Sequence, residues 1–367
     1  MIDTVVNEYF PDHVSLPGET LSEALANRGM KQSELAVRTG RTTKHINEII
    51  KGKASITAET AIQLERVLGI PASFWNNRQS VYDEFVARQE ESIRIDEQLQ
   101  WAGLFPYRKM AELGWVKPAR DKATKLRNLL NYFEVATPDA WNCRWQAVDA
   151  AYRLSRSCNP DRYALAAWLQ MGELIGRQRD CQPFDATAFR SYLEKARGLT
   201  RESAEVFQRE LMDGGQACGV VVAFIRELPR TASGATRWLF PDKALMQLSL
   251  RYKTDDQLWF TFFHEAAHIL KQQKRRIFIE GGSCSDTDET EANSFAANFL
   301  IPSERYAQFV DGMRFTDESI RRFAADLGIA PGIVVGRLQH DNYLLHNRCN
   351  NLKRFLTWGV SRQAPKP

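Results

Sequence analysis

Residues 258–270 read LWFTFFHEAAHIL, an apolar helical pattern that contains the pentad His264-Glu265-Ala-Ala-His268. Side chains four residues apart lie on one face of a helix, so both imidazoles can bind the same metal ion. Glu265 points to the side, where it can reach a water that the metal activates. Burying two histidines and a glutamate among such apolar neighbours would be costly without a metal or other partners. The pattern therefore predicts the first half of a zinc (Zn²⁺) hydrolase site.

A zinc site of this kind needs a third protein ligand and leaves a fourth position for water. The segment ETEANSFAA, which begins at Glu289, is a second helical pattern that offers two carboxylates. Glu289 shares a helix face with Ala292 and Asn293, whereas Glu291 shares a face with Phe295. Because a ligand helix must approach the pentad helix closely, the face with small residues favours Glu289, and Glu291 remains the substitute. Asn293 is expected to form a hydrogen bond with one of the metal ligands without binding the metal itself.

Short helical patterns separated by turns fill the N-terminal region, roughly residues 1–91. A helix followed by a glycine-containing turn and a second helix is the sequence form of a helix-turn-helix. Either Thr42 or Thr43 can cap the third helix, whose buried side is Ile46, Ile49 and Ile50. The other expected helices lie around Leu21–Gly29, Gln32–Thr39 and Thr57–Leu68.

The charge of this region is concentrated in one segment. Residues 28–53 contain seven Lys or Arg and two Glu, a net charge of +5, whereas the rest of residues 1–91 has three basic and eleven acidic side chains, a net charge of −8. Binding to phosphates requires such a local excess of positive charge. The segment therefore predicts a surface that binds DNA.

The remaining sequence indicates a helical middle region and a mixed C-terminal region. Residues 92–215 carry no catalytic motif, and we interpret them as core and spacer of unknown role. Residues 216–345 open with a buried strand over 219–225 and a half-exposed strand over 244–252, whose edge could pair with an extended peptide. Residues 346–367 form a basic tail that we expect to be loose. The helices expected in these regions cover 139–156, 162–177, 186–197, 202–213, 258–270, 287–300, 317–327 and 331–340.

Composition indicates a folded protein without a membrane segment. The chain has 367 residues, 44% hydrophobic and 26% charged, and its net charge of +4 is too mild to argue for nucleic-acid binding by itself. The start of the chain lacks the pattern of a signal peptide, and its apolar runs are too short to span a membrane. The six cysteines are scattered and form no C-x-x-C pair. We expect a cytoplasmic protein with free thiols.

The two C-terminal motifs together resemble the ImmA/IrrE family of metallo-endopeptidases. These motifs are FHEAAHIL (263–270) and ETEANSFAANFLIP (289–302), which fit the family's H-E-x-x-H and its downstream E-x-x-A-N-x-F-A. The resemblance implies a small α+β zincin-like peptidase domain in a mainly α protein. It also implies His264, His268 and Glu289 as zinc ligands and Glu265 as the general base. Such enzymes typically cleave helix-turn-helix repressors.

The N-terminal region resembles a different family, the HigA-type antitoxins. The resemblance rests on LPGETLSEAL, GMKQSELA, GKASITAETA and LGIPASFWNNRQSVYD within residues 16–83. Such proteins are Xre-like repressors that dimerise, bind an operator in double-stranded DNA and often neutralise a HigB ribonuclease toxin. Carried over by position, phosphate contacts fall to Gln32, Arg41, Thr42 and Lys51, and base contacts to Thr43, Lys44 and Asn47.

Three functions compete on this evidence. The first is a DNA-binding regulator whose endopeptidase cleaves a repressor or antitoxin and so switches phage, mobile-element, defence or stress genes. The second is a HigA-type antitoxin or autorepressor, a homodimer with a HigB-like partner, in which the peptidase fold serves binding or sensing. The intact ligand and base set favours the first, since a scaffold has no need of Glu265. In a third, DNA regulates the peptidase through the basic segments 120–127 and 271–276.

Overall fold

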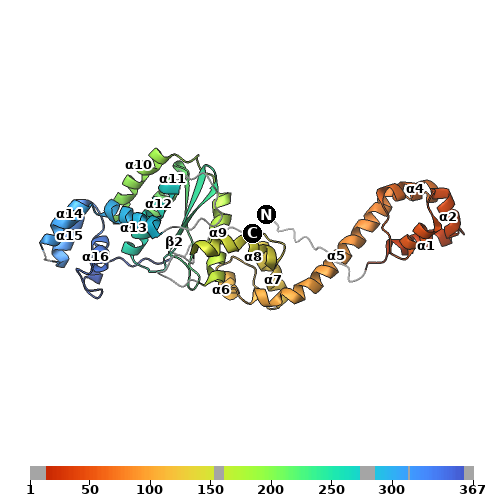
Figure 1. Cartoon of the computed structure of the whole chain (residues 1–367), viewed down its shortest axis with the longest axis horizontal. Helices are drawn as coiled ribbons and strands as arrows, with labels where there is room; N and C mark the ends of the chain where they lie inside the picture. Colours follow the sequence, from red (N-terminus) through yellow and green to blue (C-terminus); the bar gives the residue numbers. More distant parts are fainter. Residues whose placement is uncertain (1–13, 153–160, 273–285, 313–314, 359–367) are drawn as a thin grey trace. The chain divides into compact units, whose positions relative to one another are not determined.

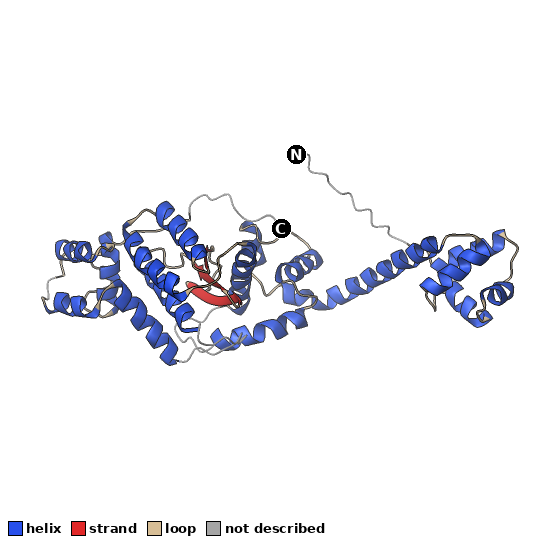
Figure 2. Cartoon of the chain, turned by 90° about the horizontal axis from the view of Figure 1, so that it is seen from above, coloured by secondary structure: helices blue, strands red, loops and turns tan. Residues whose placement is uncertain are grey.

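The computed structural model describes residues 14–152, 161–272, 286–312 and 315–358, which form two compact units divided after Glu97. Figure 1 labels many of the elements, and Figure 2 shows that most of the described elements are helices, with a few strands in the second unit. The predicted fold class, mainly α with a small α+β part, is confirmed.

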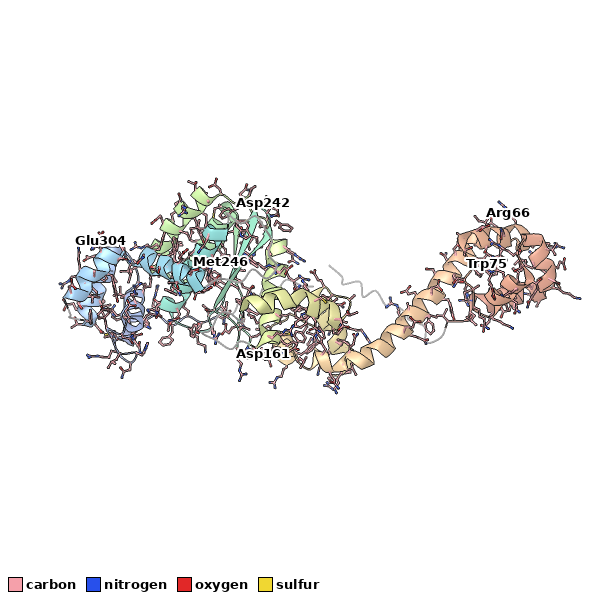
Figure 3. All side chains as sticks on the ribbon, in the orientation of Figure 1. Arg66, Trp75, Asp161, Asp242, Met246 and Glu304 are labelled. Atoms are coloured by element: carbon pink, nitrogen blue, oxygen red, sulfur yellow. The ribbon has the colours of Figure 1, made fainter. Side chains whose placement is uncertain are left out.

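The first unit packs short helices around an apolar core that contains Trp75 (Figure 3). The turn between the second and third helices uses Gly40 in the left-handed conformation, at φ 69°, which suits a residue without Cβ. Thr42 caps the third helix by accepting a hydrogen bond from the backbone N–H of His45. These helices are α1 (Pro17–Asn27), α2 (Gln32–Thr39), α3 (Thr43–Ile50), α4 (Ala58–Leu68) and α5 (Ala72–Ala102), which ends in the second unit.

The second unit begins with helices packed around aromatic side chains. Trp101, Phe105, Phe133 and Trp141 contact one another edge to face or tilted, with ring centroids 4.7–6.4 Å apart, and all four are buried. Such aromatic pairs add stability beyond the area that they bury. The helices are α6 (Tyr107–Glu112), α7 (Lys122–Phe133), α8 (Pro138–Tyr152), α9 (Arg162–Gln178), α10 (Ala186–Gly198), the 3₁₀ turn η1 (Leu199–Arg201) and α11 (Ala204–Ala217).

A three-stranded mixed sheet follows, formed by β1 (Val220–Phe224), β2 (Gly234–Phe240) and β3 (Lys243–Leu248). The strand order is β1-β3-β2, with β1 parallel and β2 antiparallel to β3. The expectation that residues 244–252 form a half-exposed strand with a free edge was wrong. β3 is the central strand and residues 244–248 are buried, because both neighbours pair with it and α9 and α12 contact it.

Five helices complete the second unit, and one of them, α12, buries its apolar side chains in the core and carries the pentad. Trp259 and Phe262 of α12 are buried in one core with Tyr192 and Leu193 of α10 and Phe207 of α11. Helices from the predicted spacer therefore build the core around the pentad helix. The five are α12 (Asp255–Gln272), α13 (Asp286–Leu300), α14 (Ser303–Asp311), α15 (Asp317–Leu327) and α16 (Pro331–His340).

The segment after α16 packs against the start of α12, although the sequence was expected to be loose there. Its short 3₁₀ turn η2 spans Asn350–Leu352. Lys353 Nζ donates to Asp256 Oδ2 at 2.7 Å, and Arg354 Nε donates to Asp255 Oδ2 at 3.1 Å. Both aspartates are buried in the first turn of α12, where carboxylates favour the helix dipole. Each of the two aspartates at the start of α12 is therefore paired with a basic residue of this segment.

None of the described helices is long and apolar enough to cross a membrane.

We predict that Lys353→Met lowers the free energy of unfolding of the second unit by about 3–5 kcal/mol, because it leaves the Asp256 carboxylate buried without its cation. The side chains of this pair are only 12% and 4% exposed. Urea titration followed by tryptophan fluorescence and circular dichroism measures the change. Arg322→Met is the control, since its ion pair with Glu318 is exposed and contributes under about 1 kcal/mol. Equal losses in the two variants would contradict the prediction.

Candidate metal centre

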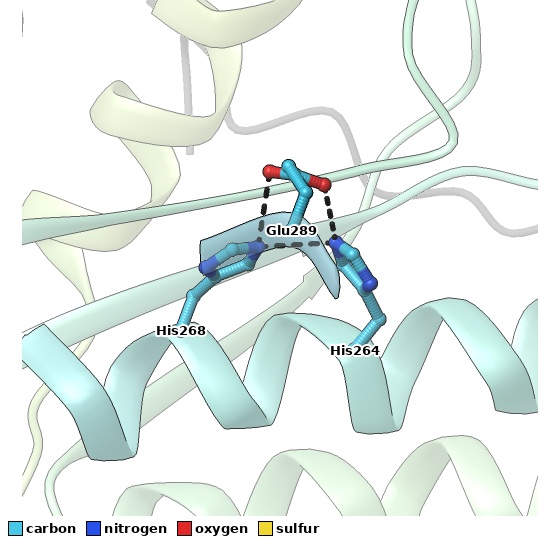
Figure 4. Close-up of side chains that lie close together, drawn as sticks. All are labelled: His264, His268 and Glu289. Atoms are coloured by element: carbon cyan, nitrogen blue, oxygen red, sulfur yellow. Dashed lines mark hydrogen bonds and ion pairs between the residues drawn. The ribbon is translucent and has the colours of Figure 1, made fainter. Parts of the chain in front are cut away.

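Two imidazoles and one carboxylate converge between α12 and α13 (Figure 4). The Nε2 atoms of His264 and His268 lie 3.0 Å apart. The two carboxylate oxygens of Glu289 lie 3.4 Å from them, one from each Nε2. The histidine side chains are 15% and 10% exposed and that of Glu289 is 40% exposed, so the cluster is set into the surface and reaches solvent on the side of the carboxylate.

Asn293 fixes the orientation of the first histidine. Its Oδ1 lies 3.0 Å from Nδ1 of His264, and it stands one helical turn after Glu289 on α13. When Nδ1 donates its proton to this amide oxygen, the neutral imidazole keeps its lone pair on Nε2, which faces His268 and Glu289. The sequence predicted that Asn293 hydrogen-bonds to a metal ligand, and in the structure this contact is made to His264.

Helix packing brings Glu289 rather than Glu291 to the histidines. Ala292 and Ala296 are buried, so α13 can lie close to α12 with the Glu289 side of the helix inward. Glu291 lies on a different side, where its Oε2 forms an ion pair with Lys271 Nζ at 2.5 Å. Its carboxylate is thus engaged with a lysine instead of the histidines.

Helix α10 holds the far end of α13. The guanidinium of Arg197 donates to the carbonyl oxygens of Phe299 and Leu300 at 2.9 and 3.0 Å, where the helix leaves these acceptors without backbone partners. A cation at a helix C-terminus also favours the helix dipole. Arg197 therefore helps to set the position of the helix that carries Glu289.

The donor set fits a zinc ion. Two imidazole nitrogens and a carboxylate oxygen are the ligand types of catalytic zinc sites, which keep a fourth position open. Ligand atoms about 2.0–2.1 Å from a tetrahedral ion lie about 3.3 Å from one another. The two Nε2 atoms lie 3.0 Å apart, and each lies 3.4 Å from a different oxygen of Glu289, so each of these pairs is near that value. The ligand atoms of the three residues all lie within 4.8 Å of one another. The cluster can therefore hold such an ion with little movement of its side chains.

Glu265 is buried and faces β2. A Cβ placed on Gly234 would lie 2.8 Å from Oε1 of Glu265, so this glycine makes room for the carboxylate. The Thr236 side chain hydrogen-bonds to the same carboxylate. Neither Gly234 nor Thr236 was predicted from the sequence to belong to the site. The alternation in GATRWLF (234–240), between the glycine and a Pro-Asp turn, was the signal for this strand.

The electrostatics of the cluster suit its chemistry. Burial raises the pKa of the Glu265 carboxyl, although the nearby imidazoles and Thr236 oppose this shift. Hydrogen bonds from the two imidazoles hold the pKa of Glu289 well below its usual range. Burial disfavours the charged form of His264, but its hydrogen bond to Glu289 and the charge of Glu265 outweigh burial and raise its pKa. Glu289 is thus ionised, as a ligand must be, and Glu265 is a stronger base than an exposed glutamate.

In the first unit, most of the predicted DNA-contacting residues lie on accessible positions of α2, α3 and the turn between them. Thr42, Thr43, Lys44 and Lys51 are exposed, whereas Gln32 and Asn47 are half-buried. Ile46 and Ile49 face the core, as expected. Arg41 differs from the others, because its guanidinium contacts Glu59 at 2.9 Å and Gln63 at 2.8 Å, both on α4.

Comparison with known proteins matches both units to families. Residues 21–75 match the family described as helix-turn-helix, and residues 225–339 match the IrrE N-terminal-like domain, a peptidase family. The chain therefore contains an N-terminal helix-turn-helix domain and a C-terminal IrrE N-terminal-like domain. Within the IrrE-like domain, the His264, His268 and Glu289 cluster is consistent with a metal site. The N-terminal domain is of the Xre type and resembles HigA antitoxins.

Individual relatives resemble about a quarter of the chain. The virulence-associated protein I of Dichelobacter nodosus is 40% identical over 81 residues, which are 22% of this chain and 75% of that protein. An addiction module antidote protein of the HigA family from Coxiella burnetii is 32% identical and covers 23% of this chain and 95% of its own, with a TM-score of 0.22. The antitoxin GraA is 27% identical and covers 24% and 95%, with a TM-score of 0.23.

We predict that the purified protein contains about one zinc ion per chain and that Glu289→Ala loses it, because two histidines alone hold zinc weakly. Glu291→Ala is the matched control, since it removes a carboxylate of the same helix that faces Lys271. Elemental analysis by mass spectrometry after dialysis measures the metal. Zinc retained by the Glu289 variant, or lost by the Glu291 variant, would show that the wrong carboxylate was chosen.

Proposed function

We propose that this protein is a DNA-binding transcriptional regulator with zinc-dependent endopeptidase activity. It would cleave a repressor or antitoxin protein and thereby switch phage, mobile-element, defence or stress genes. The observation that carries the proposal is that the Glu265 carboxylate lies beside β2, next to the cluster of His264, His268 and Glu289. The same chain also contains a helix-turn-helix domain.

In this proposal the three clustered residues hold the metal. His264 and His268 contribute Nε2, and Glu289 contributes a carboxylate oxygen. Asn293 keeps His264 in the tautomer that leaves Nε2 free to bind. A bound zinc ion would supply the Lewis acid that a peptide carbonyl needs.

Glu265 is the proposed general base. It would take a proton from the attacking water and pass the proton to the amine of the leaving peptide. Burial raises its pKa, which makes the carboxylate better able to accept that proton at neutral pH. The hydrogen bond from Thr236 and the room left by Gly234 keep the carboxylate beside β2.

The strand β2 is the proposed docking edge for the peptide substrate. Within the part of the chain that the structure describes, β2 pairs on one side with β3. An extended peptide can add to such an edge through its backbone groups. Because Gly234 and Thr236 of this strand contact Glu265, a peptide on β2 would lie next to the base. This edge replaces the one first expected on residues 244–252.

The helix-turn-helix domain is proposed to place the protein at an operator, as a homodimer. Lys44 is 85% exposed in the first turns of α3, and Thr43 precedes it on the same helix. Residues at the start of a recognition helix reach base edges in the major groove. The second candidate function is that of an antitoxin or autorepressor, which the resemblance to HigA proteins favours. That function does not account for a buried carboxylate beside a three-ligand cluster.

We expect Glu265→Gln to keep the zinc and to reduce cleavage by about 10²–10⁴-fold, because the amide cannot accept the proton. Proteomic comparison of cells that express the wild type with cells that express this variant would identify the substrate. We expect it to be a DNA-binding protein that is cleaved only in the cells with the wild type. Glu291→Gln serves as a control with the same chemical change outside the cluster. If cleavage persists in the Glu265 variant, another group is the base.

We expect Lys44→Ala combined with Asn47→Ala to reduce the preference for the operator over unrelated DNA, because each lost base contact costs about 1–3 kcal/mol of discrimination. Lys51→Ala should instead weaken binding to both DNAs equally, as a phosphate contact does. Titration of operator and scrambled duplexes at fixed salt concentration distinguishes the two effects. An unchanged preference in the double variant would mean that α3 does not read the bases.

A further inference from the structure

A second segment of the chain has the same net charge as the helix-turn-helix segment. Residues 108–127 contain seven Lys or Arg and two acidic residues, a net charge of +5 within 20 residues. They span α6, α7 and the connection between these helices, all in the second unit. Neither the metal cluster nor the recognition helix accounts for this charge.

Part of this segment lines an open groove of about 930 Å³. The end of α5 forms one side, and α6 and α7 supply basic side chains, including Arg108, Lys109, Lys122 and Lys125. Arg108 has 94% of its side chain exposed, and Lys122 is also exposed. The groove therefore presents cations to solvent instead of burying them.

The two carboxylates of the segment neutralise little of this charge. Glu112 forms ion pairs with Arg108 at 3.0 Å and Lys109 at 3.2 Å. Asp121 accepts the hydrogen bond of the Thr124 backbone N–H and caps α7. Among the described residues, no carboxylate forms an ion pair with the remaining cations, which are Lys117, Arg120, Lys122, Lys125 and Arg127.

Hydrogen bonds fix the backbone of the connection between α6 and α7. The hydroxyl of Tyr107 donates to the carbonyl oxygen of Lys117 at 2.6 Å, and Asn128 Nδ2 donates to the same hydroxyl at 2.7 Å. Lys125 lies over the Tyr107 ring, 5.8 Å from its centroid. The backbone that carries these cations is therefore already ordered before a ligand binds. This reduces the entropic cost of binding.

The cations of the groove suit a polyanion, and the exposure of its aromatic rings indicates which kind of polyanion can bind. The aromatic residues that line the groove, Phe105 and Tyr107, are only 5% and 7% exposed. Single-stranded nucleic acids are bound by aromatic faces that are open for stacking with bases. Fixed cations without open rings instead suit the phosphates of a duplex.

We propose that the groove between the end of α5 and α6–α7 is a second DNA-binding surface, which contacts the phosphates of double-stranded DNA without reading its sequence. This surface adds to the affinity that the helix-turn-helix supplies, because both are parts of one chain. Of the other basic segment, residues 273–276 lie outside the described residues, so the proposal rests on the groove alone.

The test uses the full-length protein and a fluorescent 30-base-pair duplex that lacks an operator. Lys44→Glu with Lys51→Glu removes the charge of the recognition helix, and this background should still bind the duplex with an affinity that falls with salt. Adding Arg108→Glu and Lys122→Glu should weaken the remaining binding at least tenfold and reduce the salt slope by about two, since each phosphate contact contributes about 0.9.

The matched control adds Arg321→Glu and Arg322→Glu to the same background. Both residues are exposed on α15, and Arg322 pairs with Glu318 four residues before it, as Arg108 pairs with Glu112. The control should bind as its background does, and circular dichroism should show equal folding in all variants. Absence of salt-dependent binding in the background, or an equal loss in the control, would overturn the proposal. So would stronger binding of a single strand or of polyglutamate.

Discussion

The packing of α13 on α12 is the constraint on which the rest of the structure depends. A metal cluster needs donors from both helices within about 3–4 Å, and this is reached because Ala292 and Ala296 leave no bulk between the helices. The same register directs Glu289 to the histidines and Asn293 to the back of His264. Any larger residue on this face would move the carboxylate and the amide together.

Three other parts of the second unit fix the positions of these two helices. Arg197 of α10 holds the end of α13, and Lys353 and Arg354 hold the beginning of α12 through two buried aspartates. β2, the third part, leaves room for Glu265 at Gly234. The precision of the cluster therefore depends on segments that lie far from α12 and α13 in the sequence, since the contacts of Arg197, Lys353 and Arg354 span 102, 97 and 99 residues.

Positive charge is arranged differently in the two units. On α3 it accompanies polar side chains at the start of a helix that is amphipathic, so that charge and hydrogen-bonding groups share one surface. On α6 and α7 the charge lies along a groove whose aromatic residues are buried. Equal net charge thus has different consequences, because one surface offers groups that can distinguish bases and the other offers cations alone.

The sequence by itself determined the elements and the chemistry that depend on local spacing. Helical period placed α12, α13, α15 and α16 within a few residues of their ends, and four-residue spacing brought His264 and His268 together. Tertiary structure decided what depends on distant segments: that β3 is central, that β2 lies beside Glu265, and that the tail clamps α12. Alternation along a strand reports its two faces but not its neighbours in the sheet, and a basic tail carries no sign of the buried carboxylates that it meets.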